Sequence, residues 1–507
     1  MHLFALLVLM ASTQAPPTGA RPIVKPEGET ALTIYSSADP AGFDPQRWIQ
    51  QQRQGVDNPW GVPGYGVVKV VREVEMPKGT GTLSFTDVAA WIDPTSVSFA
   101  DLDDPETSVI EQSFQFDLVS PSKLTERYIG RKVVISSPIG GVFKVFEGTL
   151  LSATQAQLVV QMDDGLHIVA ATGAQITLGE LPGGLLMKPT LVWRLANASG
   201  GRHFVRTTYQ TSGITWRADY NLTLSEKEDA ADLGAWVTLL NLSGASYLDA
   251  TLKLVAGDVQ RVREHAPRGG GSGGMLGVSA RMADEGGFEE QSFFEYHLYS
   301  LPRRTDVLQN TTQQIALFPT VTGFHVKKEL RFDFTGGMGV ASEPMVEREF
   351  EQEMKGNPSV FVQFENKKEE QLGMPLPAGK VRVYKQDPHD GTLEFIGEDL
   401  IAHTPRNETV CIKLGEAFDV VGERTRMDFQ VDTSAKRMSE SFRIEIRNQK
   451  SQAQRVRVHE RLYRWTNWKI EKANAKFEKL DANTIAFDAE VPAEGKKVIE
   501  YTVVYSW

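Results

Sequence analysis

An acidic cluster early in the chain offers the residue types that bind hard cations. Four carboxylates fall within the segment ADLDDPETS: Asp101, Asp103, Asp104 and Glu106. Carboxylate oxygens are the ligands that Ca²⁺ prefers in proteins. The glycine and the distal bidentate glutamate of an EF-hand loop are absent, however, and Pro105 favours a turn. We therefore expect a solvated loop here, with a metal site at the four carboxylates as the alternative.

A second candidate site consists of arginines on two neighbouring stretches near the C-terminus. Residues 441–449 and 455–461 both alternate apolar and charged residues, which predicts two half-buried strands joined by a polar turn. If the strands pair, their polar faces form one ribbon: Arg443, Arg447, Arg455, Arg457 and Arg461. Arginine binds carboxylate and phosphate in bidentate geometry, so the ribbon could recognise an anionic polysaccharide or lipid. The interpretation that we favour is that Glu445, Glu460 and nearby acids neutralise it.

A glycine-rich segment matches two catalytic motifs in form only. Residues 269–274 read GGGSGG, which fits both the dinucleotide pattern G-x-G-x-x-G and the nucleophile pattern G-x-S-x-G around Ser272. The first needs a strand before it and a helix after it, and the second needs a rigid turn. A run of glycines gives mobility instead. We therefore expect a flexible surface loop over residues 261–288.

Histidine and glutamate stand two residues apart in a predicted strand. Glu295 and His297 would share one face of it, as two metal ligands could. A third ligand is missing and the chain has no H-E-x-x-H motif, so we expect a polar strand face. A hydrolase would need a site assembled from distant residues, such as Glu295, His297 and Asp101. No motif indicates a cofactor.

Strands must position these residues, because the chain alternates with the period of β-structure almost throughout. Short apolar stretches separated by proline and glycine predict an N-terminal β domain over 65–128 and a central β-sandwich over 182–260. Similar stretches continue through a C-terminal β-sandwich region over 289–507. The predicted fold class is therefore all-β, with several β-sandwich-like domains.

A compact strand set is predicted between the first two of these domains. Residues 129–181 resemble a small SH3-like or Sm-like barrel, in which Asp164 and Gly165 form a hairpin turn. Its five expected strands are Lys132 to Ser136, Val142 to Ser152, Gln157 to Met162, Leu166 to Ala170 and Ala174 to Leu178. Ser120 and Pro121 open a short helix before it, and Gly130 can end that helix in the left-handed conformation.

The first residues have the pattern of a secretory leader. An apolar run from Leu3 to Ala11 is followed by small residues, which predicts a signal peptide over residues 1–20. Cleavage after Ala20 is preferred to cleavage after Ala15, because Pro16 would follow the second site. We therefore expect an exported protein, periplasmic or extracellular.

Residues 21–64 are rich in proline, glycine and glutamine, which predicts a linker. It contains one helix signal, since Asp44 can cap a helix that begins at Pro45. Gly55 can end that helix.

Composition excludes some classes of protein. The formal net charge is −11 and the pI is about 5.5, so the chain should repel nucleic acid. Cys411 is the single cysteine, which excludes intramolecular disulfides and multi-cysteine metal sites. No stretch after the leader has the ~18 apolar residues of a transmembrane helix.

Two stretches carry a family resemblance. The first runs from Tyr209 to Val259 and contains Trp216–Tyr220 (WRADY) and Val255–Asp258 (VAGD). The second begins at Pro375 with PLPAGKVRVY and runs to the end of the chain. Together they resemble the domain of unknown function 4139 of exported bacterial proteins, including those called mucoidy inhibitor A-like, over roughly residues 200–507.

This resemblance implies export and β-structure but no reaction, because the family has no established catalytic residues or cofactor. The segment EYHLYSLPR at residues 295–303 fits the same group. The chain departs from the mucoidy-inhibitor pattern, since residues 129–181 stand where those proteins have a long coiled coil.

These features lead to one functional hypothesis and two alternatives. The hypothesis is a non-catalytic exported envelope protein that binds or scaffolds an anionic envelope polysaccharide, a lipid or another envelope protein. The first alternative is a periplasmic hydrolase with a site assembled from distant residues. The second is an outer-membrane β-barrel, because residues 501–507 alternate aromatic residues and end in Trp507. We favour a sandwich strand for this segment.

Overall fold

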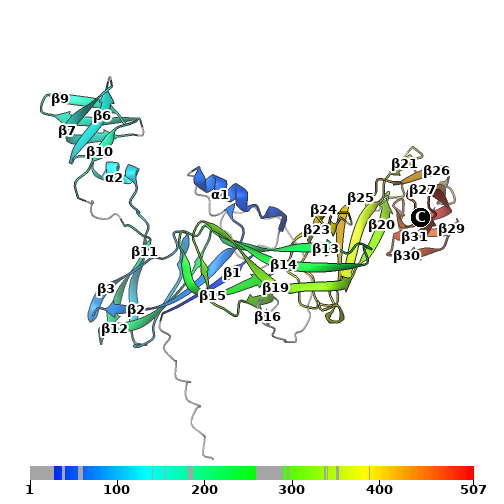
Figure 1. The fold of residues 1–507 in the computed structure, drawn as a ribbon, viewed down its shortest axis with the longest axis horizontal. Helices are drawn as coiled ribbons and strands as arrows, with labels where there is room; N and C mark the ends of the chain where they lie inside the picture. Colours follow the sequence, from blue (N-terminus) through cyan, green and yellow to red (C-terminus); the bar gives the residue numbers. More distant parts are fainter. Residues whose placement is uncertain are drawn as a thin grey trace, which may run out of the picture.

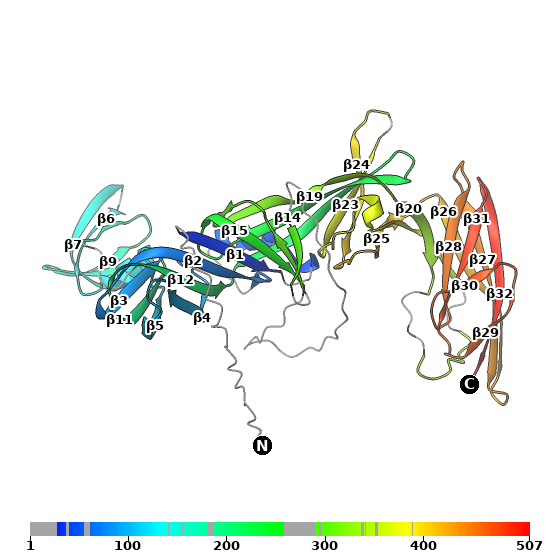
Figure 2. The same ribbon diagram turned by 90° about the horizontal axis from the view of Figure 1, so that it is seen from below.

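The protein is an elongated chain of β-sheets. The computed structural model describes residues 28–36, 40–54, 61–139, 141–154, 156–180, 186–257, 289–293, 296–335, 339, 341–349, 353–387 and 389–507. These residues form six sheets, which confirms the all-β fold class. Figures 1 and 2 show a small sheet (β6–β10) at one end and the C-terminal strands at the other. The predicted signal peptide and the loop at 261–288 lie outside the described residues.

Eight strands form the N-terminal sheet. Its order is β16 (Glu289–Phe293), β17 (Tyr296–Ser300), β15 (Tyr247–Ala256), β1 (Glu29–Tyr35), β2 (Tyr65–Met76), β12 (Gly201–Thr211) and β4 (Ile92–Asp101), with β18 (Thr305–Val307) beside β15. β1 lies within the expected linker, yet it pairs with β2 and β15 and fully buries Leu32 and Ile34. The linker prediction is therefore wrong here, because alternation at these two residues outweighs the polar composition around them.

A short three-stranded sheet covers one end of the N-terminal sheet. It consists of β3 (Gly79–Thr86), β11 (Thr190–Asn197) and β5 (Ser108–Gln115). Trp193 of β11 is fully buried against Phe85 and Phe99, with ring centroids 5.6 and 4.9 Å apart. β11 and β12 pair with strands from residues 65–128 in both sheets. The two domains expected at 65–128 and 182–260 therefore share one core.

The small sheet is inserted between β5 and β11. Its order is β10 (Gln175–Thr177), β6 (Lys132–Ile139), β7 (Val142–Ala153), β8 (Gln157–Met162) and β9 (Gly165–Ala170). It has its own core, which includes Tyr128 at the end of α2 (Pro121–Arg127). Ser120 caps α2 and Gly130 follows it with φ of 82°, as predicted. The five predicted strands are present, but β9 and β10 do not pair in the described structure, so the sheet is not a closed barrel.

Three further sheets complete the chain. The middle sheet contains β19 (Thr311–His325), β14 (Ala230–Asn241), β13 (Ile214–Leu224), β23 (Gly379–Gln386) and β24 (Leu393–Ile401). The bridging sheet contains β25 (Thr409–Glu416), β22 (Ser359–Glu365), β20 (Lys327–Asp333), β28 (Gln454–Arg461), β31 (Thr484–Val491) and β30 (Phe477–Lys479). The C-terminal sheet contains β21 (Glu353–Gly356), β26 (Val420–Asp432), β27 (Arg437–Asn448), β32 (Gly495–Ser506) and β29 (Trp468–Ala473).

The bridging sheet connects two cores. β22 and β25 contribute to the large core shared by the N-terminal and middle sheets. β28 and β31 instead pack against the C-terminal sheet and form a sandwich with it. Tyr501 and Tyr505 of β32 are buried in that sandwich, as the favoured interpretation of the terminal strand predicted.

The remaining helices are short. α1 (Pro45–Arg53) begins after Asp44, whose Oδ1 accepts a hydrogen bond from the Arg47 backbone N at 3.0 Å, which confirms the predicted cap. Trp48 anchors α1 on Leu240 and Leu242 of the middle sheet region. Among the described residues, 3₁₀ turns occur at Pro40–Gly42 and Lys368–Glu370. Gly55, the predicted end of α1, lies outside the described residues.

Candidate functional site

The structure separates the arginines that the sequence predicted on one ribbon. β27 belongs to the C-terminal sheet and β28 to the bridging sheet, so they do not pair. Their inward residues, such as Ile444 and Val458, meet in the sandwich core. The outward arginines fall on two opposite surfaces: Arg443 and Arg447 on one, and Arg455, Arg457 and Arg461 on the other. The prediction of a single ribbon is therefore wrong.

Acidic neighbours neutralise four of these arginines. The distances from guanidinium nitrogen to carboxylate oxygen are 3.2 Å for Arg443–Glu500, 3.2 Å for Arg447–Glu423, 3.0 Å for Arg455–Asp488 and 2.5 Å for Arg457–Glu478. Hydrogen bonds from Arg447 also lower the pKa of Glu445. The backbone N of Arg461 donates to Thr335 Oγ1 at 2.7 Å. Glu445 pairs with Arg447, as the favoured interpretation predicted, but Glu460 does not neutralise these arginines, because it is buried against Arg424.

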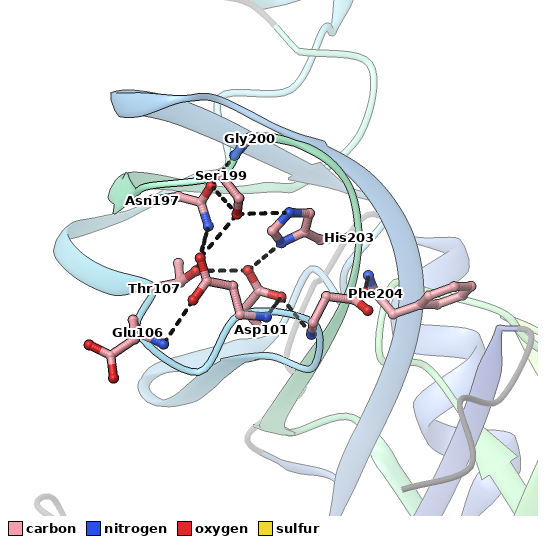
Figure 3. A network of polar contacts seen from close by, with 10 residues as sticks. Asp101, Glu106, Thr107, Asn197, Ser199, Gly200, His203 and Phe204 are labelled. Atoms are coloured by element: carbon pink, nitrogen blue, oxygen red, sulfur yellow. Dashed lines mark hydrogen bonds and ion pairs between the residues drawn. The ribbon is translucent and has the colours of Figure 1, made fainter.

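The acidic segment after β4 instead closes a polar network, shown in Figure 3. Asp101 is buried at the end of β4. Its Oδ1 accepts hydrogen bonds from the backbone N atoms of Asp103 and Asp104 at 3.0 and 3.1 Å. Its Oδ2 accepts one from Thr107 Oγ1 at 2.7 Å. An aspartate that binds backbone N–H groups just after it makes an Asx turn, which explains why the chain reverses at this segment.

The turn between β11 and β12 completes the network from the other side. Asn197 Nδ2 donates to Asp104 Oδ2 at 3.1 Å and to Thr107 Oγ1 at 2.7 Å. Asp103 Oδ2 accepts the backbone N–H of Phe204 at 2.6 Å. The acidic loop is therefore fastened to a turn almost one hundred residues away in the sequence.

A histidine that the sequence analysis missed links Asp101 to a serine. His203 Nδ1 lies 2.7 Å from Asp101 Oδ2, and His203 Nε2 lies 3.4 Å from Ser199 Oγ (Figure 3). This order of groups is the one that activates a serine nucleophile in hydrolases. Ser199 Oγ also lies 3.1 Å from Asp104 Oδ2, however, and a hydroxyl has one proton to donate. A carboxylate attracts that proton more strongly than a neutral imidazole at 3.4 Å, so the arrangement favours a structural role.

The four carboxylates do not converge on a common point, contrary to the metal-site alternative. In the described part of the chain, no group of three His, Cys, Asp or Glu side chains is placed to hold a metal ion. Oxygens of Asp101, Asp103 and Asp104 instead accept the hydrogen bonds described above. Glu106 is exposed, and only its backbone N–H joins the network, through Asp104.

The network also shifts the titration of Asp101. Burial disfavours its charged form, but hydrogen bonds from Thr107, His203 and two backbone N–H groups outweigh burial and lower its pKa. A carboxyl group with a lowered pKa stabilises the folded state above its unfolded pKa of about 3.9. That stabilisation is lost as the pH falls through the folded pKa.

We expect Asp101→Asn to remove this pH-dependent stabilisation. The variant should be less stable than the wild type by about 1–2 kcal/mol at pH 7, because a buried charged acceptor is lost. The deficit should shrink as the pH falls from about 4 to 2, where the wild-type carboxyl also becomes neutral. Urea unfolding of both proteins at several pH values measures it, with Glu106→Gln as an exposed control. A deficit that is equal at every pH would contradict the argument.

The residues of the hydrolase alternative are not brought together. His297 lies on β17 and Asp101 on β4, with β15, β1, β2 and β12 between them in the same sheet. Five strand spacings separate β17 from β4, about 24 Å at ~4.8 Å each. Glu295 lies outside the described residues. The partner of Asp101 is His203 instead.

The WRADY segment that carries much of the family resemblance ties the N-terminal segment to the middle sheet. Trp216 Nε1 donates to the backbone O of Ile34 in β1 at 3.1 Å. Arg217 donates to the backbone O of Phe43 at 3.2 Å and stacks over its ring. Arg217 is also paired with Asp219 at 2.7 Å. These residues therefore hold β1 and the α1 region in place.

The same segments meet at a second point. Tyr220 OH donates to the backbone O of Pro377 at 2.8 Å, and Tyr299 OH donates to the backbone O of Pro375 at 2.9 Å. Both tyrosines are almost fully buried. The WRADY, EYHLYSLPR and PLPAG segments therefore form one junction, and its residues have structural roles.

A comparison with models of known protein families finds no match for this chain, and a comparison with curated protein sequences finds none either. In the described residues, no helix has the length and apolar character needed to cross a bilayer.

Proposed function

We propose that the protein is a non-catalytic exported protein of the cell envelope that binds or scaffolds a partner. The observation that carries this proposal is the surface of the small sheet. Five of its large apolar side chains are between 62 and 68% exposed: Val142, Phe143, Val145, Leu166 and Ile168. Several strongly exposed apolar side chains on one small sheet indicate a region that binds a partner.

The connection of the small sheet to the rest of the molecule supports a display role. The two connecting stretches run side by side, since Leu118 and Leu186 form a parallel bridge. The backbone N of Val119 donates to the Leu186 backbone O at 2.9 Å. The two connecting stretches therefore form a stalk that carries the small sheet. The small sheet lies apart from the large core of the N-terminal and middle sheets (Figure 1).

Export, envelope location and kinship with the domain of unknown function 4139 belong to the same proposal. They are supported by the leader pattern and by the WRADY and PLPAG segments. The partners that fit an apolar surface are a lipid or another envelope protein. We do not propose an anionic polysaccharide held by the five arginines, because they lie on two opposite surfaces and four of them are paired with carboxylates. Nucleic acid is not proposed, given the net charge of −11.

A second candidate function is a hydrolase centred on Ser199. The chain of contacts from Ser199 through His203 to Asp101 specifically favours it. The competing contact from Ser199 to Asp104 is the reason that we rank it second.

Binding to the native envelope tests the proposal. The mature chain, residues 21–507, is mixed with an envelope fraction of the source organism and sedimented. Excision of residues 120–180 removes the small sheet and keeps the stalk pair of Val119 and Leu186. We expect the wild type and Ser199→Ala to sediment with the envelope, and the excised chain to remain in solution.

A fluorophosphonate probe tests the hydrolase in the same samples. We expect no labelling of Ser199, since its proton is directed to Asp104. Labelling that disappears in Ser199→Ala would establish the hydrolase instead. If the wild type fails to sediment with the envelope, the binding role is wrong.

A further inference from the structure

The hairpin of β6 and β7 projects beyond the rest of the small sheet. The two strands pair from Lys132–Thr149 to Ile139–Val142. On one side, β10 reaches only as far as Ser136. On the other side, β8 pairs with β7 only from Thr149 onward. In the described part of the chain, residues 137–139 and 141–144 therefore have no third strand beside them.

The end of this hairpin is apolar on both faces. Ile139 pairs with Val142, and Pro138 pairs with Phe143, so the two pairs point to opposite faces of the ribbon. These four residues are the hairpin tip. Val142 is 66% exposed, Phe143 is 68% exposed and Ile139 is 43% exposed. Pro138 lies beside Gly173 of the turn before β10, whereas the buried core residues of the small sheet lie further along the strands.

A convex tip with apolar side chains on both faces fits a lipid bilayer. A rigid protein partner would need a groove that encloses both faces of the ribbon. A bilayer closes around an inserted group without a preformed groove. The favourable free energy of insertion grows with the apolar area that is removed from water.

The charge around the tip favours an anionic bilayer. Lys144 is the only charged residue between positions 133 and 146, and it is exposed beside Phe143. The small sheet, residues 132–177, contains two basic and three acidic residues, so it is nearly neutral in a chain of net charge −11. A basic residue beside an inserted apolar group adds attraction to anionic headgroups.

The acidic residues of the small sheet stand back from the tip. Gln161 pairs with Thr149, seven residues along β7 from Val142. Asp163 and Asp164 follow in the next turn, and Glu147 lies five residues along β7 from Val142. At ~3.3 Å per residue, all three carboxylates lie at least about 13 Å short of the tip. The tip can therefore reach headgroups before these carboxylates approach them.

We propose that the hairpin tip inserts into the headgroup region of an anionic lipid bilayer and anchors the small sheet there. This inference rests on the proposed binding function and names its partner. The long molecule then extends from the bilayer, with the C-terminal sandwich at the far end (Figure 2).

Vesicle sedimentation tests the inference with a matched control. The full mature chain is mixed with vesicles of phosphatidylethanolamine and phosphatidylglycerol. Val142→Ser with Phe143→Ser should lower the bound fraction at least tenfold, because the inserted groups are lost. Leu393→Ser with Phe395→Ser removes side chains of similar exposure, 57 and 55%, from β24 of the middle sheet and should leave binding within twofold. Lys144→Glu should weaken binding to these vesicles but not to phosphatidylcholine vesicles.

Each other outcome overturns the inference. If the wild type does not bind the vesicles but still sediments with the native envelope, the partner is a protein or glycan and the binding function stands. If both double variants lose binding equally, the tip is not the anchor. If the tip variant instead converts a wild-type dimer to a monomer in sedimentation velocity, without vesicle binding by the wild type, the tip contacts a second copy.

Discussion

Glu460→Gln should destabilise the C-terminal sandwich by about 3–5 kcal/mol, because it leaves a buried arginine without its partner. Arg424 Nε lies 2.9 Å from Glu460 Oε2, and the two side chains are 1 and 0% exposed. Tyr501 OH donates to the same oxygen at 2.5 Å. Despite burial, the negative charge of Glu460 raises the pKa of Arg424, so the carboxylate stabilises the charged guanidinium. The variant loses this stabilisation while the arginine stays charged, because a guanidinium group is not deprotonated in proteins. Urea unfolding followed by the fluorescence of the sandwich tryptophans measures the loss.

Two controls separate burial from charge. Glu500→Gln removes the exposed partner of Arg443 and should cost less than about 1 kcal/mol, as exposed ion pairs do. Replacing the buried group by Arg424→Met, Glu460→Leu and Tyr501→Phe should recover most of the loss, since an apolar set leaves no unpaired charge. If Glu460→Gln and Glu500→Gln unfold at the same urea concentration, the buried pair has no special role.

Alternation along a strand predicts which residues are buried but not which strand lies beside it. In β27 and β28 the predicted inward residues, such as Ile444 and Val456, are fully buried. The inferred hairpin between them was nevertheless wrong, because the intervening turn carries the chain from one sheet of the sandwich to the other. A polar turn of a few residues fits both connections, and only packing of the two sheets distinguishes them.

Pairing between distant segments explains the other differences. β1 is a short strand in a segment of mostly polar composition. It is held in the sheet by pairing with β2 and with β15, and β15 lies more than two hundred residues away in the sequence. The small sheet was predicted more closely, since its strands follow one another and pair locally. Strands that pair locally are separated by short turns, which can be recognised in the sequence. Strands that pair over a long range have no such turn between them.

The candidate site shows the same limit at the level of side chains. The turn in the acidic segment could be predicted from the sequence, because closely spaced aspartates before a proline favour Asx turns. The hydrogen bond between Asp101 and His203 could not be predicted, because the two residues are 102 positions apart and no motif connects them. The WRADY segment was recognisable as a pattern, but its role became clear only when its partners, Ile34 and Pro377, were located.

Gly379→Ala should be strongly destabilising, by about 3 kcal/mol or more, because no atom can be added at this position without moving a backbone. Gly379 begins β23, which runs parallel to β13 with Gly379 opposite Ala218. A Cβ atom on Gly379 would lie 2.2 Å from the Ala218 backbone O and 2.9 Å from the Tyr220 ring. Relief of this contact would separate the two strands and pull Pro377 from Tyr220.

Gly356→Ala is the matched control, since Gly356 also lies in a strand, β21, but a Cβ atom there would meet nothing within 4 Å. Alanine should be neutral or slightly stabilising there, because it reduces the entropy of the unfolded chain. Thermal unfolding by circular dichroism compares the two variants with the wild type. The Gly379 variant should unfold first in the large core, with earlier exposure of Trp216 and Trp193 than of the sandwich. Equal melting of the two variants would mean that β13 and β23 can separate at little cost, and that the PLPAG junction does not hold the middle sheet together.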